Sequence, residues 1–534
     1  MEGEDYLIRE ASYYGNMARG MFRLLRHHPM TDRSAALRDQ MANRESRFLE
    51  NARTMVFANP RNPYHSMFRL AGCEWKDLGE SVTKRGLEST LEQLAREGVF
   101  LTHDEFKGKT PLVRSGRHIE LAPETLLNPR NRGGMETMSG GSRSLGTKTR
   151  KSLELQLYRD VYDQLLTREF DLERRTRILV LPILPSSVGL GNSIRRARAG
   201  ERIDKWFSVR GTLRDSGHYR ALTNALVVLG RSMGASLPWP TYLPPNDFLP
   251  AARWIAGRKR EGRPCAVRSY VSPAVRIADA ARSAGLDISG TLFFVAGEAL
   301  TEAKRATIEE TGAEVYPGYG ITEVGSVGVA CRQMRQGNCV HLFSDQLAVV
   351  NRVRRAPLSG EQVNSLLFTN LLPSAPRFLI NAEMDDSGVI EPAVCDCEYS
   401  RAGMTMQIRN IFSYGKLTGQ GVTLFGTDVV RILEAALPRR FGGAPGDYQL
   451  VEREAGRQTE LILRVSPRVA AATDDVREAF LNEVRGCYGG TLAARLWNHS
   501  AGLTVVSAEP VTTRSGKVLP LHILGAEARH AHAS

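Results

Sequence analysis

The sequence has no long hydrophobic run. Its longest apolar stretch, Ile178 to Leu184, is far too short to cross a bilayer and contains Pro182. The first residues, Met1 to Asp5, are acidic where a secretory signal would be basic. Cysteine is also scarce, since the 534 residues include only seven, an odd number that disfavours a disulfide framework. We therefore expect a reduced cytoplasmic protein without a membrane segment.

Several common catalytic motifs are missing as well. The sequence has no strong nucleophile elbow of a serine hydrolase, no His-Glu-x-x-His zinc motif and no Rossmann glycine fingerprint. These absences disfavour the usual serine hydrolases, zinc proteases and dinucleotide-dependent oxidoreductases.

The composition is that of a folded, multidomain protein. Apolar residues make up 42% and charged residues 24% of the chain, and the length suggests about two to four domains. The net charge of +13 fits an anionic partner such as a nucleotide, CoA or nucleic acid, but a solvated arginine-rich surface explains it equally well. No aromatic residues interleave the basic clusters at 195–198 and 258–260, so nucleic-acid binding is a minor hypothesis.

The middle of the chain alternates between strand and helix patterns. Thr291 to Ala296 reads as a buried strand, Thr301 to Thr311 as a helix closed by Gly312, and Glu314 to Tyr316 as a second strand. This alternation predicts an α/β fold with parallel strands flanked by helices. Ligands of such sheets bind beyond the carboxyl ends of the strands.

Two domains are expected. Residues 1–414 would form a large N-terminal domain that begins with a helical leader over residues 1–130. Residues 415–534 show a compact α+β pattern and would form a small C-terminal domain. The glycines at 415, 419 and 421 suggest a hinge between them.

The pentapeptide from Tyr319 to Glu323 follows the second of these strands. Tyr319 offers an aromatic face for a base, and Gly320 lets a ligand approach the backbone. Thr322 offers a hydroxyl and Glu323 a carboxylate, which suits Mg²⁺ and phosphate. The pattern favours a nucleotide site, although five residues can match by chance.

A loop rich in glycine and hydroxyls precedes it. Backbone N–H groups and hydroxyls on one loop form an anion cradle. A flexible linker is an equally good interpretation, and the spacing is not that of a Walker A motif. The candidate residues are Ser139, Gly140, Gly141, Ser142, Gly146 and Thr147.

Two further candidates lie beyond the pentapeptide. Asp386 could bind a ribose diol, or Asp385-Asp386-Ser387-Gly388 could be an ordinary turn. Lys517, in a Ser-Gly-Lys turn after the last expected strand, could reach an acyl phosphate, although most such lysines are only solvated.

Five thiol and imidazole groups fall within 67 residues, at Cys331, Cys339, His341, Cys395 and Cys397. Such groups form closed tetrahedral zinc sites. The preferred ligands are Cys331, His341, Cys395 and Cys397, with Cys339 as a spare. The single residue between Cys395 and Cys397 is tighter than usual, and unrelated buried cysteines are the alternative.

Taken in order, these motifs resemble those of the AMP-forming adenylating superfamily of acyl-CoA synthetases. Within it they look most like the phenylacetate–CoA ligase branch and the related acyl-protein synthetases of bacterial luminescence systems. The resemblance runs from about residue 130 to about residue 520. Residues 139–147 resemble the family's phosphate loop with an insertion, 297–300 its Gly-Glu-Pro-Leu turn and 319–323 its Tyr-Gly-x-Thr-Glu motif. Residues 379–386 resemble the stretch that ends in the family's ribose-binding aspartate, and 513–517 the terminal motif that holds its adenylation lysine.

Two departures from the family pattern stand out. Asp385 replaces the usual glycine before the ribose aspartate. The stretch 413–421 lacks the usual Gly-Arg-x-Asp-Asp hinge pattern, which leaves the hinge residue open.

The resemblance implies that ATP and Mg²⁺ are used in two half-reactions. A carboxylic acid forms acyl-AMP, and a nucleophile then displaces AMP while the C-terminal domain rotates. The resemblance implies that the 139–147 loop binds the β- and γ-phosphates, that Thr322 contacts the α-phosphate and that Glu323 ligates Mg²⁺. It also implies that Tyr319 packs on the adenine, that Asp386 binds the ribose and that Gly297, Glu298 and Gly320 belong to the nucleotide site. Lys517 would bridge the substrate carboxylate and the α-phosphate. Some members of the branch also carry a Cys/His zinc site.

The acceptor stays open at this stage. A thiol, on CoA or on the pantetheine of a carrier protein, is the first choice, and an amine or hydroxyl is the second. A third hypothesis is a regulator that binds nucleotide without catalysis. The acid itself is not identified by the sequence.

Overall fold

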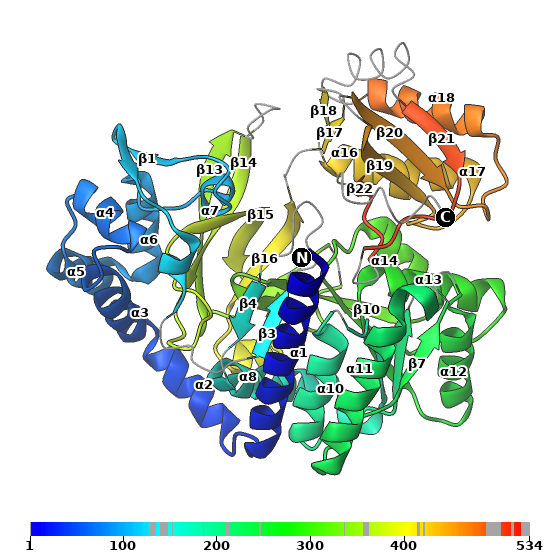
Figure 1. The fold of residues 1–534 in the computed structure, drawn as a ribbon, viewed down its shortest axis with the longest axis horizontal. Helices are drawn as coiled ribbons and strands as arrows, with labels where there is room; N and C mark the ends of the chain where they lie inside the picture. Colours follow the sequence, from blue (N-terminus) through cyan, green and yellow to red (C-terminus); the bar gives the residue numbers. More distant parts are fainter. Residues whose placement is uncertain are drawn as a thin grey trace.

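The protein is described from a computed structural model. It describes residues 2–128, 135–138, 148–151, 153–184, 186–209, 213–244, 247–335, 337–355, 362–413, 417–419, 422–424, 426–455, 458–486, 503–513 and 517–524. The described elements combine a large mixed sheet, flanking helices and a smaller C-terminal sheet (Figure 1). The expected α/β class is thus confirmed.

The chain begins with helices drawn in blue in Figure 1, where α1 lies near the middle of the view and α2 to α6 run up the left side. Their bounds are α1 Glu2–Arg26, α2 Arg33–Ala42, α3 Arg44–Ala52, the π-helical turn η1 Arg53–Phe57, α4 Pro63–Leu70, α5 Trp75–Arg85, α6 Leu87–Arg96 and α7 His103–Phe106. The hairpin β1 Leu112–Arg114 with β2 Arg117–Ile119 and the 3-10 turn η2 Pro123–Leu126 follow. Apolar faces of α3 to α6 pack in one core with the antiparallel part of the large sheet.

The described strands of the large sheet take the order β13-β14-β15-β16-β12-β11-β10-β9-β8-β5-β6-β7. The half from β7 to β10 is parallel and the half from β10 to β13 is antiparallel. The parallel strands are β5 Thr176–Val180, β6 Lys205–Val209, β7 Pro240–Leu243, β8 Cys265–Ser269, β9 Leu292–Ala296 and β10 Glu314–Ile321. The others are β11 Gly325–Val329, β12 Val340–Leu342, β13 Leu347–Arg355, β14 Gln362–Asn370, β15 Ala382–Pro392 and β16 Met406–Ser413.

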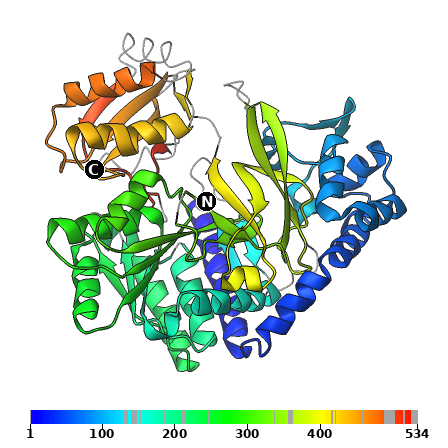
Figure 2. The same cartoon turned by 180° about the vertical axis from the view of Figure 1, so that it is seen from behind.

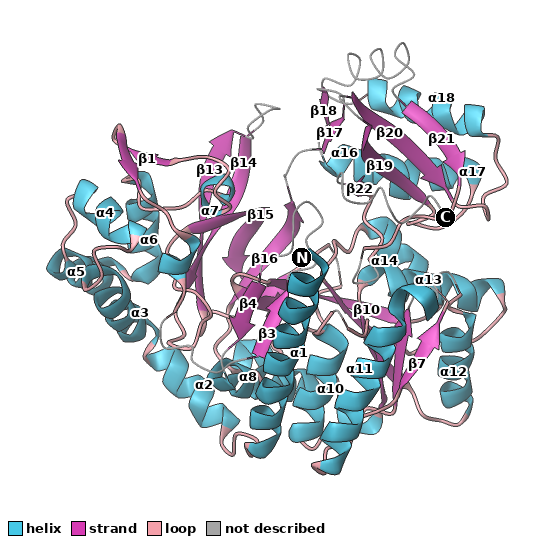
Figure 3. Cartoon of the chain, viewed as in Figure 1, coloured by secondary structure: helices cyan, strands magenta, loops and turns pink. Residues whose placement is uncertain are grey.

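Helices cover both faces of the parallel half, as the strand–helix alternation requires (Figure 3). One face packs on α12 Leu249–Arg260, α13 Val271–Ser283 and α14 Glu302–Glu309. The other packs on α8 Leu153–Tyr158, α9 Asp160–Glu169, α10 Val188–Arg198, α11 Leu213–Ser232 and α1. The short elements η3 Leu172–Arg174 and α15 Glu398–Arg401 complete this domain.

The predicted strand–helix–strand unit is confirmed. β9, α14 and β10 follow in that order, and β9 pairs with β10 in parallel. Thr301 caps α14, because its hydroxyl accepts the N–H of Lys304 at 3.4 Å. The second strand does not stop at Tyr316, where it was expected to end, but continues to Ile321 and turns into β11.

The C-terminal part has its own sheet of described strands, ordered β21-β20-β19-β22. The strands are β19 Tyr448–Ala455, β20 Gln458–Val465, β21 Leu503–Ser507 and β22 Leu521–Leu524. The helices α16 Gly426–Arg431, η4 Ile432–Ala436, α17 Leu437–Phe441 and α18 Thr473–Arg485 accompany them, with the hairpin β17 Leu417–Gly419 and β18 Val422–Leu424. Helices and sheet share a separate core and lie over the α14 end of the parallel half in both views (Figures 1 and 2). Of the expected hinge, the glycines at 415 and 421 lie outside the described residues.

In the described part of the chain, no helix is both long and apolar enough to cross a membrane.

Candidate functional site

The candidate site is at the carboxyl ends of the parallel strands. Tyr319 and Gly320 belong to the end of β10, and a bulge between them separates the strand from the turn that holds Thr322 and Glu323. Gly320 is exposed and Thr322 is half-buried, whereas Glu323 is buried. The pentapeptide therefore places its side chains at the ligand-binding edge of the sheet.

Tyr319 and Asp386 meet although 67 positions separate them. The Tyr319 hydroxyl donates to Asp386 Oδ2 at 2.6 Å, and its ring lies 6.3 Å from that of Phe368. Asp386 lies within β15, so the ordinary turn considered for this stretch is wrong. The expected base-packing and ribose-binding residues share one hydrogen bond, which holds them at one point of the edge.

The departure at Asp385 has a backbone explanation. Asp385 has a φ of 64°, in the left-handed region where glycine is most at ease and where aspartate and asparagine are the best tolerated substitutes. Its Oδ2 lies 3.1 Å from Nδ1 of His103 on α7. A side chain that glycine would lack thus ties the ribose-aspartate strand to the N-terminal region.

Glu323 also contacts the end of α7. Its Oε1 accepts a hydrogen bond from Lys107 Nζ at 2.6 Å. Both side chains are largely buried, so this ion pair is sheltered from solvent. No sequence pattern marks Lys107 or His103, because they lie more than 200 positions from their partners, within or directly after the short helix α7.

Lys517 docks on the turn after β9. Its Nζ donates to the Gly297 carbonyl at 2.8 Å and lies 4.6 Å from the centre of the Tyr270 ring. Gly297 has a φ of 81°, and a Cβ there would lie 2.9 Å from Nζ and 3.1 Å from the ring. The positive φ and these close contacts favour glycine as the first residue of the 297–300 turn.

The charge of Lys517 is balanced within the site. Burial lowers the pKa of Lys517, and the nearby Glu298 carboxylate acts in the opposite direction. Burial raises the pKa of Glu298, against the effects of Lys304, the Ser272 hydroxyl and Lys517. The Ser272 hydroxyl donates to Glu298 Oε2. Glu298 is therefore the local counter-ion of two lysines.

Contacts between the two domains hold Lys517 in this place. Lys304 Nζ lies 2.8 Å from Glu434 Oε1, and the Thr301 hydroxyl donates to Glu434 Oε2 at 2.7 Å. Only 4% of the Lys304 side chain and 3% of the Glu434 side chain are accessible. We call Thr301, Lys304 and Glu434 the interdomain latch. A more exposed pair joins Arg468 to Asp279 at 2.9 Å.

The expected phosphate-loop residues, 139–147, lie outside the described residues. The strands on either side are described: β3 Met135–Met138 pairs antiparallel with β4 Lys148–Lys151, with Met138 opposite Lys148. The six candidate residues of the loop stay a prediction.

The four preferred zinc ligands converge. The sulfurs of Cys331, Cys395 and Cys397 and one ring nitrogen of His341 all lie within 4.8 Å of one another. His341 Nε2 is 3.3 Å from Cys395 Sγ and 3.2 Å from Cys397 Sγ, and the two sulfurs are 3.7 Å apart. The spare residue, Cys339, is not part of the cluster; its thiol donates to Gln407 at 3.2 Å.

These distances fit a tetrahedral zinc ion. Zinc bonds of about 2.3 Å to sulfur and about 2.0 Å to nitrogen place the ligand atoms roughly 3.5–3.8 Å apart. His341 Nδ1 lies 3.0 Å from the Met404 carbonyl, which favours a proton there and leaves Nε2 available. A hydrogen bond from Cys331, and then one from His341, lower the pKa of Cys397 against the effect of burial, which favours the thiolate form that a zinc ligand needs.

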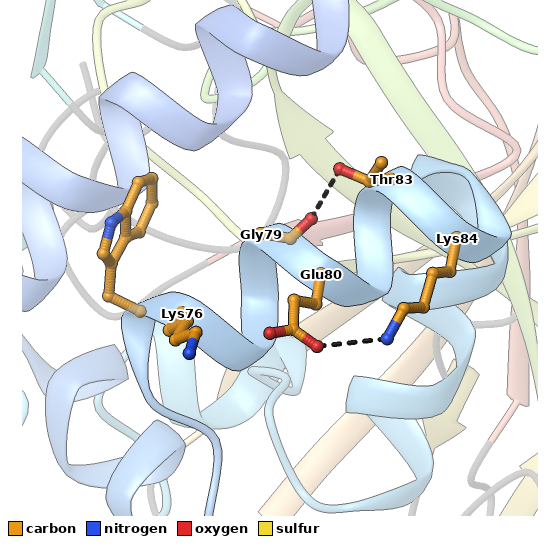
Figure 4. Close-up of a pocket in the computed structure, with 6 residues that line it drawn as sticks. Lys76, Gly79, Glu80, Thr83 and Lys84 are labelled. Atoms are coloured by element: carbon orange, nitrogen blue, oxygen red, sulfur yellow. Dashed lines mark hydrogen bonds and ion pairs between the residues drawn. The ribbon is translucent and has the colours of Figure 1, made fainter.

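Two surface depressions lie apart from these residues. One, of 360 Å³, runs along α5, where Lys84 pairs with Glu80 at 3.1 Å and no cluster of reactive groups lines it (Figure 4). The other, of 690 Å³, is lined by seven arginines and three carboxylates and lies beside the first residues of β5 and β6. It is at the opposite edge of the sheet from the candidate site.

Comparisons with known proteins give fold likenesses at low identity. No family model and no curated protein matches the sequence. Among solved structures, the chain is similar to the o-succinylbenzoate coenzyme A synthetase of Bacillus subtilis in complex with ATP and magnesium ion, with a TM-score of 0.40, 10% identity and coverage of 80% of each chain.

A second similar structure is an ATP-bound RpMatB–BxBclM chimera, with a TM-score of 0.39 and 12% identity over 72% of this chain and 66% of that one. A third is an AMP-forming acyl-CoA synthetase/AMP-acid ligase II-like protein of Dyadobacter fermentans, with a TM-score of 0.28 and 15% identity over 72% and 86%.

Proposed function

We propose that this protein is an ATP-dependent, AMP-forming carboxylate ligase that makes acyl-AMP and transfers the acyl group to a thiol, on CoA or on carrier-protein pantetheine. The observation that carries the proposal is the docking of Lys517 on Gly297. It brings a cation from the C-terminal domain, 220 positions away, to the strand edge that also presents Tyr319, Glu323 and Asp386. A nucleotide-binding edge with a mobile cation is suited to phosphoryl chemistry through charge neutralisation.

The first half-reaction needs positioning more than covalent catalysis. The substrate carboxylate attacks the α-phosphorus of ATP, and pyrophosphate leaves with the electron pair of the broken P–O bond. Lys517 would offset the charge that gathers on the α-phosphate and the attacking carboxylate. Thr322 would contact the α-phosphate, and Tyr319 with Asp386 would hold the nucleoside.

Mg²⁺ enters with ATP and suits the oxygen of Glu323, since it prefers carboxylate ligands. The expected phosphate loop at 139–147 would hold the β- and γ-phosphates. In the second half-reaction a thiolate attacks the acyl carbon and AMP leaves. Lys517 is not needed there, so the C-terminal domain can undock.

A thiol acceptor remains the first choice, and an amine or hydroxyl acceptor the alternative. The regulator hypothesis is less favoured, because Lys517 and Glu323 are both present and both lie at the ligand edge. We further propose that Cys331, His341, Cys395 and Cys397 hold a structural zinc ion, since their separations fit tetrahedral coordination. This cluster is also the feature that favours the phenylacetate–CoA ligase branch.

Pyrophosphate–ATP exchange with a panel of acids tests the proposal. Exchange should depend on one class of acid, and Lys517→Ala should suppress it strongly while leaving transfer from preformed acyl-AMP largely intact. Lys84→Ala, which removes an exposed lysine distant from the site, is the matched control. Equal loss of both half-reactions in Lys517→Ala would contradict the assigned role, and ATP binding without exchange for any acid would favour the regulator.

A further inference from the structure

A layer of arginines lies under the candidate site, between α9, α10 and the sheet. Within the described part of the chain, five arginines pair with three carboxylates there, and a sixth, Arg159, lies close enough to act on them electrostatically. Arg195, Arg196 and Arg268 pair with Asp163, Arg177 and Arg196 share Glu201, and Arg198 pairs with Asp160. Most of these side chains are buried. The layer therefore holds more positive than negative charge away from water.

Among the described ion pairs of this layer, that of Arg268 is the longest. It joins Arg268 to one of the three carboxylates, Asp163, at 3.9 Å. Burial, together with the neighbouring cations Arg196 and Arg159, lowers the pKa of Arg268 to about 9. A partly buried cation whose carboxylate partner is this distant is poorly compensated unless another anion joins it.

Arg268 faces the side of the sheet where Lys517 docks. Side chains alternate along a strand, so Arg268 of β8 and Tyr270, two residues on, point to the same face. On β9 and β10 the positions level with Tyr270 are Ala296 and Gly318, which pair with each other, whereas those level with Arg268 are Phe294 and Tyr316. Ala296 is exposed, and 28% of the Arg268 side chain is accessible. The side chains next to Tyr270 are thus small, and aromatic residues flank the strand at the level of Arg268.

A second polar group lies beside Arg268 without a partner. Tyr399 of α15 is fully buried, and among the described residues its hydroxyl has no hydrogen-bond partner. Tyr399 and Arg268 interact electrostatically, and the Tyr399 ring lies 5.5 Å from that of His341. A buried hydroxyl normally finds a partner, so this one is suited to a ligand.

We infer that the acid activated by this protein carries a second anionic group, a carboxylate in the simplest case, which Arg268 and Tyr399 bind on the same face of the sheet as Lys517 and deeper in the molecule. The inference rests on the proposed function, because it assumes that the reacting carboxylate lies at Lys517. Two residues of strand separate Tyr270 from Arg268, about 6.6 Å. The second group is therefore separated from the reacting carboxylate by a short chain or a ring.

Matched acids test this inference in the exchange assay. Dicarboxylic acids of increasing length are compared with monocarboxylic acids of the same length, and aromatic diacids with their monoacid analogues. Acids with a distal sulfonate or phosphate distinguish a need for carboxylate from a need for any anion. The native protein should prefer diacids by about 100-fold or more in kcat/KM, since a site built for a polar group rejects an analogue that lacks it.

Arg268→Gln should abolish most of this preference. Tyr399→Phe, which keeps the ring, should reduce it several-fold with little effect on the monoacids. Arg263→Gln, in the basic depression at the other edge, is the matched control and should leave the preference unchanged. Because each variant is compared on two acids, any general loss of folded protein cancels.

The outcomes separate this inference from the proposed function. If monoacids support exchange as well as diacids do, and Arg268→Gln does not change the ratio of the two rates, the inference is overturned and the proposed ligase function still stands. Exchange with no acid at all would overturn the proposed function. An effect of Arg263→Gln as large as that of Arg268→Gln would also overturn the inference, because it would point to anion binding at the other edge.

Discussion

The interdomain latch gives the sharpest prediction. Glu434→Gln removes the carboxylate that pairs with Lys304 and leaves the lysine ammonium buried with an amide. Removing one partner of a buried pair costs about 3–5 kcal/mol, and both side chains here are almost inaccessible, so no discount for solvent screening is needed. Because the pair bridges the domains, this cost falls on the docked state and not on either domain alone.

A tenfold change corresponds to about 1.4 kcal/mol, so the docked state should lose roughly 100-fold or more in population relative to the undocked state. Adenylation, which needs Lys517 at Gly297, should fall by up to that factor. Transfer from chemically prepared acyl-AMP should stay within about twofold of the native rate, because it does not need the docked state. The two rates are measured separately, by pyrophosphate exchange and by single-turnover transfer.

Two variants control this experiment. In Lys304→Met/Glu434→Met no buried charge remains, so adenylation should recover much of its rate. Arg468→Met removes an interdomain pair whose arginine is half-exposed, and should change adenylation by less than about tenfold. The reasoning is refuted if Glu434→Gln lowers both half-reactions equally, or if the double variant is slower than the single one.

Two other predictions concern the metal and the lysine. Metal analysis of pure protein should find about one zinc ion per chain, and the double variant Cys395→Ser/Cys397→Ser should lose it. Cys339→Ser should keep the zinc, because the Cys339 thiol lies outside the cluster. Native protein free of metal would exclude the site. Glu298→Gln should move the alkaline limb of adenylation to lower pH, because the Glu298 anion raises the pKa of Lys517 and its removal lets burial lower that pKa further; a limb that stays in place or moves upward in the exchange rate would contradict this.

The sequence predicted the parts of the molecule that depend on local pattern. The β9–α14–β10 unit follows from apolar runs of strand length and a capped helix, and its parallel pairing is confirmed. The four metal candidates could be chosen because thiols and imidazoles are rare enough to stand out. These four lie together in the structure and Cys339 lies outside their cluster, in agreement with the preferred ligand set.

What the sequence could not predict depends on contacts between distant segments. Lys107 follows the short helix α7 and Glu434 lies in the π-helical turn η4, and no sequence pattern near them marks a partner more than 100 positions away. The extension of β10 through Tyr319 escaped detection because Gly318 and Gly320 read as the end of a strand, whereas pairing with β11 stabilises them there. The role of the 139–147 loop stays a prediction.

The ion pair between Lys107 and Glu323 has a consequence for substrate loading. A carboxylate that is to receive a divalent cation is already neutralised by an ammonium group 2.6 Å away. Arrival of MgATP would then be an exchange of counter-ions, in which the magnesium replaces Lys107 and the freed ammonium meets the incoming phosphates. The short helix α7, which also reaches Asp385, would report nucleotide occupancy to the N-terminal helices.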